Sequence, residues 1–437
     1  MWVFARTHAR IYSEFASAWN PPLEQRSSET VTVYTIEGTA LQRRMLSGFW
    51  TGTPLPDMAE IEVSSFSKYV TGPLDSVGFV DLTDRLHAEG IYDQIVEASF
   101  SPWTSRGRIF GLPHDVHPVL MVYRADIVED ELGIDVNDIE TWDDFARVMS
   151  AVFKDLDGDG WIDRYPLSFW YDDPDVVEML MLQAGGGTFN ADDEIIVASE
   201  TNARVLATVV HWCFGPGRIA LDAPEFNAGG NLLKIEGRVV CALMPDWLAG
   251  IWKNDMPQLG GKLKLMPLPA WEPGGRRTSV RGGTMLGFPK ASQLAGRFEE
   301  AWAFGKALYL STEGARELFE GSNIISPDMS LWDQSFYHEP DPYFSYQPSG
   351  SLFIEQAPHV PSRTNHPFRT IARSEIGQAA DELRDYAESV DDFTIETLLP
   401  VARRLLEEAQ DRVLGEMSRN VFLRDALTPA TESGSDR

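Results

Sequence analysis

Three aspartates at alternate positions have the spacing that points most directly to chemistry. Asp155, Asp157 and Asp159 alternate with small residues in the stretch DLDGDGWIDRY, and Gly160 follows at the sixth position. An EF-hand calcium loop begins in this way, because its first, third and fifth residues offer side-chain oxygens and its sixth residue makes a sharp turn. The stretch is therefore a candidate Ca²⁺ loop.

The remainder of this loop departs from the EF-hand pattern. At positions 7 and 9, Trp161 could offer a backbone carbonyl and Asp163 a carboxylate, but Pro166 stands where the bidentate glutamate is required. A strand-like run, YPLSFWY, follows in place of a second helix. We expect no signalling EF-hand. Two alternatives stay open: structural Ca²⁺ held by the three alternating aspartates with Trp161 and Asp163, or a metal-free turn.

Two other groups of titratable side chains could act on a ligand or bind it. Glu60 and Glu62 lie two apart in AEIEV, so on a strand they share one face. Such a pair could serve a glycosidase as acid and nucleophile, or could accept hydrogen bonds from hydroxyl groups. Asp115, between His114 and His117, could likewise do acid–base work or accept a hydrogen bond. HDVH is not the zinc motif HExxH.

Aromatic residues follow two of the predicted strands. Trp247 comes just after the run VVCALMP, and Trp170 and Tyr171 end the run YPLSFWY. In α/β sheets ligands bind at the carboxyl ends of strands. The flat C–H faces of sugars pack well on aromatic rings placed there, while polar side chains bind the hydroxyls. Any one ring could be core packing, but the set favours a ligand crevice.

The elements that must position these residues alternate between strand and helix patterns. A helix pattern over 8–20 follows MWVF, and VTVYTIEG, ALQRRMLSGFWTG and LPDMAEIEV then read as strand, helix and strand. This succession predicts strands joined by covering helices. Further on, Thr141 caps a predicted helix, with Asp144 three positions later. An amphipathic helical region is predicted over 369–417.

Composition excludes several classes of function. The chain carries 66 Asp and Glu against 37 Lys and Arg, a formal net charge of -29, with no basic cluster that could bind a nucleic acid. A self-repelling acidic surface predicts a monomer. No run of about 18 apolar residues could span a membrane. Cys213 and Cys241 lie in no metal-binding spacing, so we expect two buried thiols, with a disulfide as the alternative.

Four segments, taken in order, resemble the extracellular solute-binding proteins of bacterial carbohydrate importers, the maltose-binding-protein-like receptors of ABC transporters. They are GLPHDVHPVLMVYRADI, TWDDFARVMSAVFKDLDGDGWIDRYPLSF, CALMPDW and RRTSVRGGTMLGFPKAS, and the likeness runs from Trp2 to about Met417. The resemblance implies two α/β lobes, each a mainly parallel sheet flanked by helices, with a ligand cleft between them. The expected division is 1–117 with 284–340, then 118–283 with 341–427, then a disordered tail at 428–437.

The same resemblance implies which residues bind the sugar. In the first lobe they come from the loop after the first strand and from the end of the strand AEIEV. In the second lobe they come from the end of the strand after the Asp-rich loop and from the turn MPDW. The others lie where the chain crosses from the first lobe to the second and where it returns. The candidates are Arg6, Thr7, His8, Glu60, Glu62, His114, Asp115, Trp170, Tyr171, Asp246, Trp247, Arg281, Gly282 and Gly283. The Asp-rich loop is implied to be a second-lobe feature apart from this site.

The function implied is that of an extracytoplasmic receptor that closes around a sugar and delivers it to permease subunits, without catalysis or a required cofactor. HDVHP and PLPAWEPGGRRTS resemble members that carry plant-type oligosaccharides, which suggests an arabinose-containing ligand. Two alternatives remain: a glycan-cleaving enzyme using Glu60 or Asp115, and a sugar-binding protein that serves a sensor. We expect a periplasmic or lipid-anchored location. Because the sequence begins inside the strand pattern MWVF, where we see no export signal, we expect that a leader was trimmed or that the start codon was assigned too late.

Overall fold

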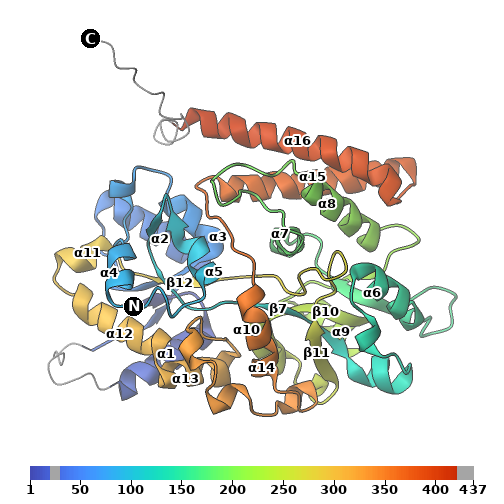
Figure 1. Ribbon diagram of the computed structural model, residues 1–437, viewed down its shortest axis with the longest axis horizontal. Coiled ribbons are helices and arrows are strands. Elements are labelled where there is room, and N and C mark those ends of the chain that lie inside the picture. Colours follow the sequence, from blue (N-terminus) through green and yellow to red (C-terminus); the bar gives the residue numbers. More distant parts are fainter. Residues whose placement is uncertain (20–29, 421–437) are drawn as a thin grey trace, which may run out of the picture.

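The computed structural model describes residues 1–19 and 30–420, and it has two lobes side by side (Figure 1). Each lobe contains a five-stranded sheet flanked by helices. The predicted two-lobed α/β architecture is therefore confirmed. The tail predicted at 428–437 lies outside the described residues.

The first lobe is built on a sheet with the strand order β2-β1-β3-β12-β6. β1 pairs in parallel with β2 and with β3, whereas β12 is antiparallel to both β3 and β6. The strands are β1 (Trp2–Val3), β2 (Tyr34–Thr35), β3 (Ala59–Glu62), β6 (Leu112–Pro113) and β12 (Thr284–Gly287).

The second lobe is built on a sheet with the strand order β11-β7-β10-β8-β9. β8 is parallel to β9 and to β10, and β7 is antiparallel to β10 and to β11. The strands are β7 (Val119–Arg124), β8 (Tyr165–Phe169), β9 (Ala220–Asp222), β10 (Val239–Pro245) and β11 (Leu263–Pro267). A hairpin of β4 (Thr104–Ser105) and β5 (Arg108–Ile109) stands apart.

Both sheets are mixed, so the expectation of mainly parallel sheets is wrong. The antiparallel pairings all involve β12 or β7. These two strands begin where the chain has just crossed from the other lobe. A strand that enters in this way needs no crossover helix on its own sheet, so it is free to pair antiparallel with its neighbours.

Apolar side chains on both faces of the sheets hold the lobes together. On β7, Val119 and Met121 pack into one core cluster while Leu120 and Val122 pack into another on the opposite face. Such burial on both sides explains why this strand is a continuous apolar run. Around the first sheet pack α1 (Arg6–Ala18), α2 (Gly38–Thr51), α3 (Val63–Phe66), α4 (Thr83–Ala88), α5 (Glu97–Phe100), α12 (Phe298–Leu310) and α13 (Thr312–Ser322), with α11 (Lys290–Leu294) beside them (Figure 1).

The helices of the second lobe cover its sheet from both sides. One face carries α6 (Trp142–Val148), α7 (Pro174–Gln183), α8 (Glu200–Cys213), α15 (Arg369–Val390) and α16 (Ile395–Arg419). The other carries α9 (Ala228–Ile235), α10 (Asp246–Asp255) and α14 (Ser349–Gln356). Phe336 and Tyr337 also pack on this second face. The expected lobe boundary at residue 340 stays a prediction.

Local sequence signals account for several helix ends. Thr141 and Asp144 form a reciprocal capping box at the start of α6, with aspartate in the place that glutamate usually takes. The predicted helical region over 369–417 is two helices, because Asp391 ends α15 in the left-handed conformation. α15 and α16 lie along the top of the molecule in Figure 1.

The described residues test two predictions from composition. Cys213 and Cys241 are both free thiols, so the alternative of a disulfide is excluded. Cys241 is buried as predicted, whereas Cys213 is only partly buried against the second-lobe core. Within 1–19 and 30–420, none of the helices combines the length and the apolar character that a membrane span requires.

Two segments that join the lobes pair with each other. The first runs from Pro113 to Val119 and the second precedes Thr284; they pair through an isolated bridge between Pro118 and Val280. The chain crosses again between α13 and α14. In the later segment between α14 and α15, Arg363 donates a 2.5 Å hydrogen bond from its guanidinium to the Gly282 carbonyl. The surface beside the two paired connections is where the lobes face each other.

Candidate ligand cavity between the lobes

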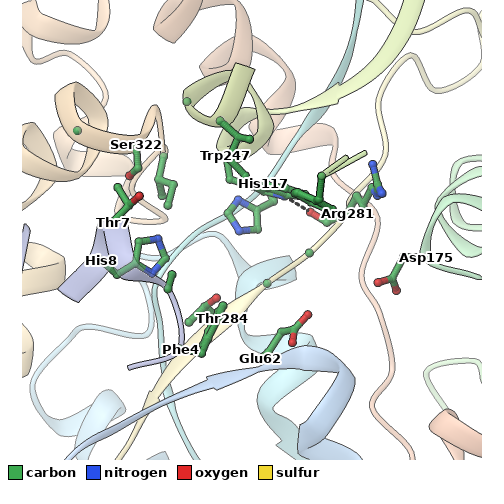
Figure 2. A pocket seen from close by; sticks show the side chains of 18 of the residues that line it. Phe4, Thr7, His8, Glu62, His117, Asp175, Trp247, Arg281, Thr284 and Ser322 are labelled. Carbon is green, nitrogen blue, oxygen red and sulfur yellow. Dashed lines mark hydrogen bonds between the residues drawn. The ribbon is translucent and has the colours of Figure 1, made fainter. Parts of the chain in front are cut away.

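A cavity of about 320 Å³ lies between the lobes beside their connections. Figure 2 shows side chains from both lobes around it. Thr7, His8 and Glu62 come from the first lobe, and Trp247 and Asp175 from the second. The second connection lines the cavity through Arg281, Gly282 and Gly283. Both lobes thus contribute to one binding surface.

Two aromatic rings form an apolar wall of the cavity. Trp247 and Phe226 are nearly parallel, at 11° and with ring centroids 6.1 Å apart. Phe226 is 56% exposed although it is a large apolar residue. Trp170 packs edge-on against Phe226 at 6.2 Å. The exposed Phe226 and the partly buried Trp247 together form a surface on which a flat apolar face can stack.

The backbone around Trp247 fixes the orientation of its indole. β10 ends at Pro245 and α10 begins at Asp246, so Trp247 lies in the first helical turn. Its Nε1 donates a 2.9 Å hydrogen bond to the Arg281 carbonyl. A Cβ on Gly282, whose φ is +82°, would lie 2.7 Å from that Nε1. Glycine is therefore required there, both for the backbone conformation and for this close approach.

Charged side chains line the cavity beside the aromatic wall. The Arg281 guanidinium donates to Asp173 at 2.6 Å and lies 5.7 Å from the centroid of the Trp247 ring. Asp175 is held by Arg373. Burial alone would raise the pKa of Asp175, but Arg373 and Arg369 outweigh it and lower that pKa. The cavity therefore offers carboxylate acceptors whose charge is already matched by arginines.

Glu62 faces Asp175 from the first lobe (Figure 2). Burial, followed by the charge of Asp175, raises the pKa of Glu62. Two carboxyl groups that approach from opposite lobes repel each other unless a ligand or a proton lies between them. A ligand with hydroxyl donors that bound between the two carboxyl groups would relieve this repulsion.

A buried charged group forms the floor of the cavity at the first connection. His117 lies between two carboxylates, 2.9 Å from Asp115 and 2.6 Å from Asp246. Burial alone would lower its pKa, but Asp115 and Asp246 raise the pKa of His117 to about 10. Asp246 also accepts from the backbone N–H of Ile325. The imidazolium thus joins the first connection to the start of α10.

The floor continues into the first lobe through a second polar group. His8 Nδ1 lies 2.8 Å from Glu60 Oε1, and the Tyr12 hydroxyl donates to the same oxygen at 2.7 Å. Burial alone would raise the pKa of Glu60, but the adjacent His8 ring outweighs it and lowers that pKa. His8 borders the cavity, whereas Glu60 is fully buried beneath it.

Seven of the predicted binding residues line the cavity. They are Thr7, His8, Glu62, Trp247, Arg281, Gly282 and Gly283. Asp246, Asp115, His114 and Glu60 are buried below it, where they hold other residues. Trp170 contacts the cavity wall through Phe226. The other two predicted residues lie elsewhere.

Tyr171 and Arg6 are the two predicted residues with no place at the cavity. The Tyr171 hydroxyl donates to the Ala380 carbonyl at 2.6 Å, and its ring packs in the second-lobe core. Both residues follow the end of β8 at Phe169, so strand alternation does not decide where their side chains point. Arg6 is exposed on the first turn of α1.

Sequence reasoning missed Phe226, Asp173 and Asp175. The stretch DPD was recognisable as a helix start, and Asp173 does cap α7. Its second role depends on Arg281, 108 residues further along the chain. Phe226 stands in a turn with φ of +61° and no strand pattern precedes it, so no local signal marks it.

The Asp-rich loop lies in the second lobe, away from the cavity. Ligand oxygens of Asp155, Asp157 and Asp159 lie within 4.8 Å of one another. Asp155 accepts from the backbone N–H groups of Gly158 and Gly160, as in a tight Asx-type turn. Asp163 accepts from the Leu156 N–H and pairs with Arg238, and Trp161 is 77% exposed. The donor set fits both a Ca²⁺ ion and a metal-free turn.

His366, in the segment between α14 and α15, gives the stability of the protein a pH dependence that can be measured. Its ring stacks on Phe189 at 4.0 Å, and burial together with Arg106 lowers the pKa of His366 to about 4. Since an unfolded histidine titrates near pH 6.5, the unfolded chain binds this proton first as the pH falls. We expect protonation at this one residue to lower the free energy of unfolding by about 2 kcal/mol as the pH falls from about 7.5 to about 5.

Urea unfolding at both pH values measures this contribution. A His366→Gln variant should lose that share of the pH dependence, because glutamine does not ionise. His338→Gln, at an exposed position, is the matched control and should keep it. Equal pH dependence in the wild type and His366→Gln would contradict the assignment.

Comparison with known proteins identifies the family to which the chain belongs. Residues 12–314, more than half of the chain, match the family model described as bacterial extracellular solute-binding protein. Arabinooligosaccharide-binding proteins of Bacillus subtilis and Halalkalibacterium halodurans are 26% and 25% identical over 358 and 352 residues. These matches cover 80% and 79% of this chain, and 78% and 74% of the relatives.

A solved structure shares the fold over nearly the whole chain. It is the ABC-transporter-associated binding protein of B. animalis subsp. lactis Bl-04 in complex with beta-1,6-galactobiose. The TM-score is 0.69 at 17% sequence identity, and the match covers 95% of this chain and 97% of the other. At this identity the likeness establishes the two-lobed fold.

Proposed function

We propose, from the premise that this chain belongs to the bacterial extracellular solute-binding protein family, that it is the receptor of an ABC importer for an oligosaccharide. The family is one of binding proteins, and its members work outside the cytoplasm. The oligosaccharide binds in the cavity between the lobes, and closure of the lobes presents the loaded receptor to the permease. Arabinose-containing oligosaccharides are the ligand class we propose, because the two curated relatives carry that name.

The observation that carries this proposal is the pairing of an aromatic wall with a charged edge in one inter-lobe cavity. Trp247 and Phe226 offer apolar area for the C–H faces of sugar rings. Glu62, Asp175 and Arg281 offer acceptors and donors for hydroxyl groups. Since the arginines nearby already pair with carboxylates, a neutral ligand fits better than an acidic one.

We propose that the ligand leaves unchanged. Of the two glutamates on one strand face, Glu62 lines the cavity and Glu60 lies beneath it, bonded to His8 and Tyr12. Asp115 is likewise held by His117 and by the N–H of Thr284. Glu60 and Asp115, the carboxylates that a glycan-cleaving enzyme was expected to use, are both buried below the cavity and bonded to other residues. Incubation with arabinooligosaccharides should therefore give no shortened product by chromatography.

A thermal-shift screen against a glycan panel tests the binding proposal. A ligand that binds only the native state stabilises it by about 2.7 kcal/mol at a concentration of about 100 times Kd. We expect arabinooligosaccharides to raise Tm and maltotriose or galactobiose to raise it less. A panel in which no neutral oligosaccharide raises Tm would refute the proposed ligand class.

The Asp-rich loop is proposed to hold Ca²⁺ as a structural brace rather than as part of the ligand site. Its three aspartates supply the oxygens, which suit this hard cation. Ca²⁺ should raise Tm of the wild type and leave Tm of Asp157→Asn unchanged. The glycan affinity should be the same in EGTA and in Ca²⁺. We further propose that the receptor acts as a monomer, held apart by its net charge of -29.

A further inference from the structure

Beneath the cavity three side chains converge that the proposed function does not use as ligand contacts. His8 comes from the start of α1, Glu60 from β3 and His114 from the first connection. Their ligand atoms all lie within 4.8 Å of one another. Glu60 and His114 are 0% and 1% exposed, and His8 is 9% exposed. Three distant segments of the chain thus place two imidazoles and a carboxylate around one buried point.

Two atoms of this cluster lack a partner. Glu60 Oε2 and His114 Nε2 are buried and form no hydrogen bond with any described residue. Buried polar atoms in native proteins are almost always paired with protein, water or an ion. The unpaired atoms here belong to the same small cluster, so one bound species could satisfy both.

The other ring nitrogen of His114 shows what kind of species this is. Nδ1 lies 3.1 Å from the Asp115 carboxylate, which can only accept, so Nδ1 carries the hydrogen. On a neutral ring Nε2 then offers a lone pair rather than a hydrogen. A histidine that donates one N–H to a carboxylate and turns the other nitrogen outward is the usual form of a metal-ligating histidine.

The carboxylate behind His114 is itself held in place. Asp115 accepts a 3.0 Å hydrogen bond from the Thr284 N–H and pairs with His117 at 2.9 Å. Support of this kind fixes the ring orientation of a metal ligand. The ring of His114 is therefore held in place by the first connection and by the start of β12, before any ion arrives.

The donor set selects the class of ion. Two imidazole nitrogens and one carboxylate oxygen form a three-ligand set typical of Zn²⁺ and related transition metals, with a fourth position left for water. Ca²⁺ and Mg²⁺ prefer sites made of oxygen. Within the described chain, the only ion-pair partner of Glu60 is His8. A divalent cation would add positive charge beside this buried carboxylate.

We infer that His8, Glu60 and His114 bind a divalent transition-metal ion of the Zn²⁺ class. Such an ion would tie the start of α1, β3 and the first connection together below the cavity. Because His8 also lines the cavity, the ion would brace the wall that receives the ligand. This role is independent of which ligand binds above it.

Metal titration of the untagged, chelator-treated protein tests the inference. Co²⁺ should bind at one equivalent and give the visible absorption of a four-coordinate nitrogen–oxygen site. Zn²⁺ should displace it with one equivalent by calorimetry and should raise Tm. His8→Gln and His114→Gln should each weaken Co²⁺ and Zn²⁺ binding at least tenfold. Asp157→Asn, in the separate Asp-rich loop, is the control and should bind as the wild type does.

The outcomes separate a metal site from a buried water. Absence of Co²⁺ absorption in the wild type, or wild-type affinity in His8→Gln, would overturn the inference. If His114→Gln does not fold, His8→Gln decides, since its ring lies at the edge of the cavity. Glycan binding measured in the same protein is a separate result, so failure of the metal site leaves the proposed function standing.

Discussion

Replacing Trp247 with alanine is expected to weaken oligosaccharide binding at least tenfold while the protein stays folded. The indole forms the cavity wall together with Phe226, and its removal takes away most of that flat apolar surface. A tenfold loss corresponds to about 1.4 kcal/mol, which is within the roughly 1–3 kcal/mol that an aromatic side chain contributes by stacking on a nucleic-acid base. Calorimetry with the oligosaccharide that gives the largest thermal shift measures this effect.

Two further variants separate stacking from a general loss of structure. Trp247→Phe keeps a ring and should lose less affinity than Trp247→Ala. Trp50→Ala removes an indole that is 84% exposed on α2 and outside the cavity, so it should bind as the wild type does. If Trp247→Ala binds the oligosaccharide with unchanged affinity, the aromatic wall does not contribute to binding.

Signals that act over a few residues could be predicted from the sequence. The capping box of Thr141 and Asp144, and the position of Trp247 at the end of a strand, each depend on neighbours in the chain. The alternation of helix and strand patterns likewise predicted sheets covered by helices, because burial of one face imposes its period on the sequence. The division into two lobes was implied by the family resemblance. Mixed pairing was missed, since strand direction depends on where the chain re-enters a sheet.

The rest of the cavity depends on contacts over long distances in the sequence. Asp173 meets Arg281 across 108 residues and His117 meets Asp246 across 129. No pattern in either stretch specifies the other. Sequence reasoning therefore placed Asp115 and Asp246 at the ligand, whereas the fold places His117 between them and uses both carboxylates to hold it.

Replacing His117 with alanine is expected to lower the free energy of unfolding by about 3–5 kcal/mol, the usual effect of leaving a buried charge without its partner. His117 is 3% exposed, and its removal leaves the Asp115 and Asp246 carboxylates buried without the cation between them. Its φ of +48° is unusual for a residue with a side chain, which indicates that these two bonds hold it there. Urea unfolding followed by tryptophan fluorescence measures the loss.

The pKa of His117 determines the pH range in which the imidazolium stabilises the fold. A folded pKa of about 10 lies above the ordinary value near 6.5, so the contribution is complete below about pH 6.5 and disappears as the pH rises through 10. The loss in His117→Ala should therefore be larger at about pH 6 than at about pH 9.5. Adding Asp115→Asn and Asp246→Asn to His117→Gln removes the uncompensated charges and should restore part of the stability. A loss below about 1 kcal/mol in His117→Ala at pH 6 would mean that this imidazolium does not hold the lobe connection together.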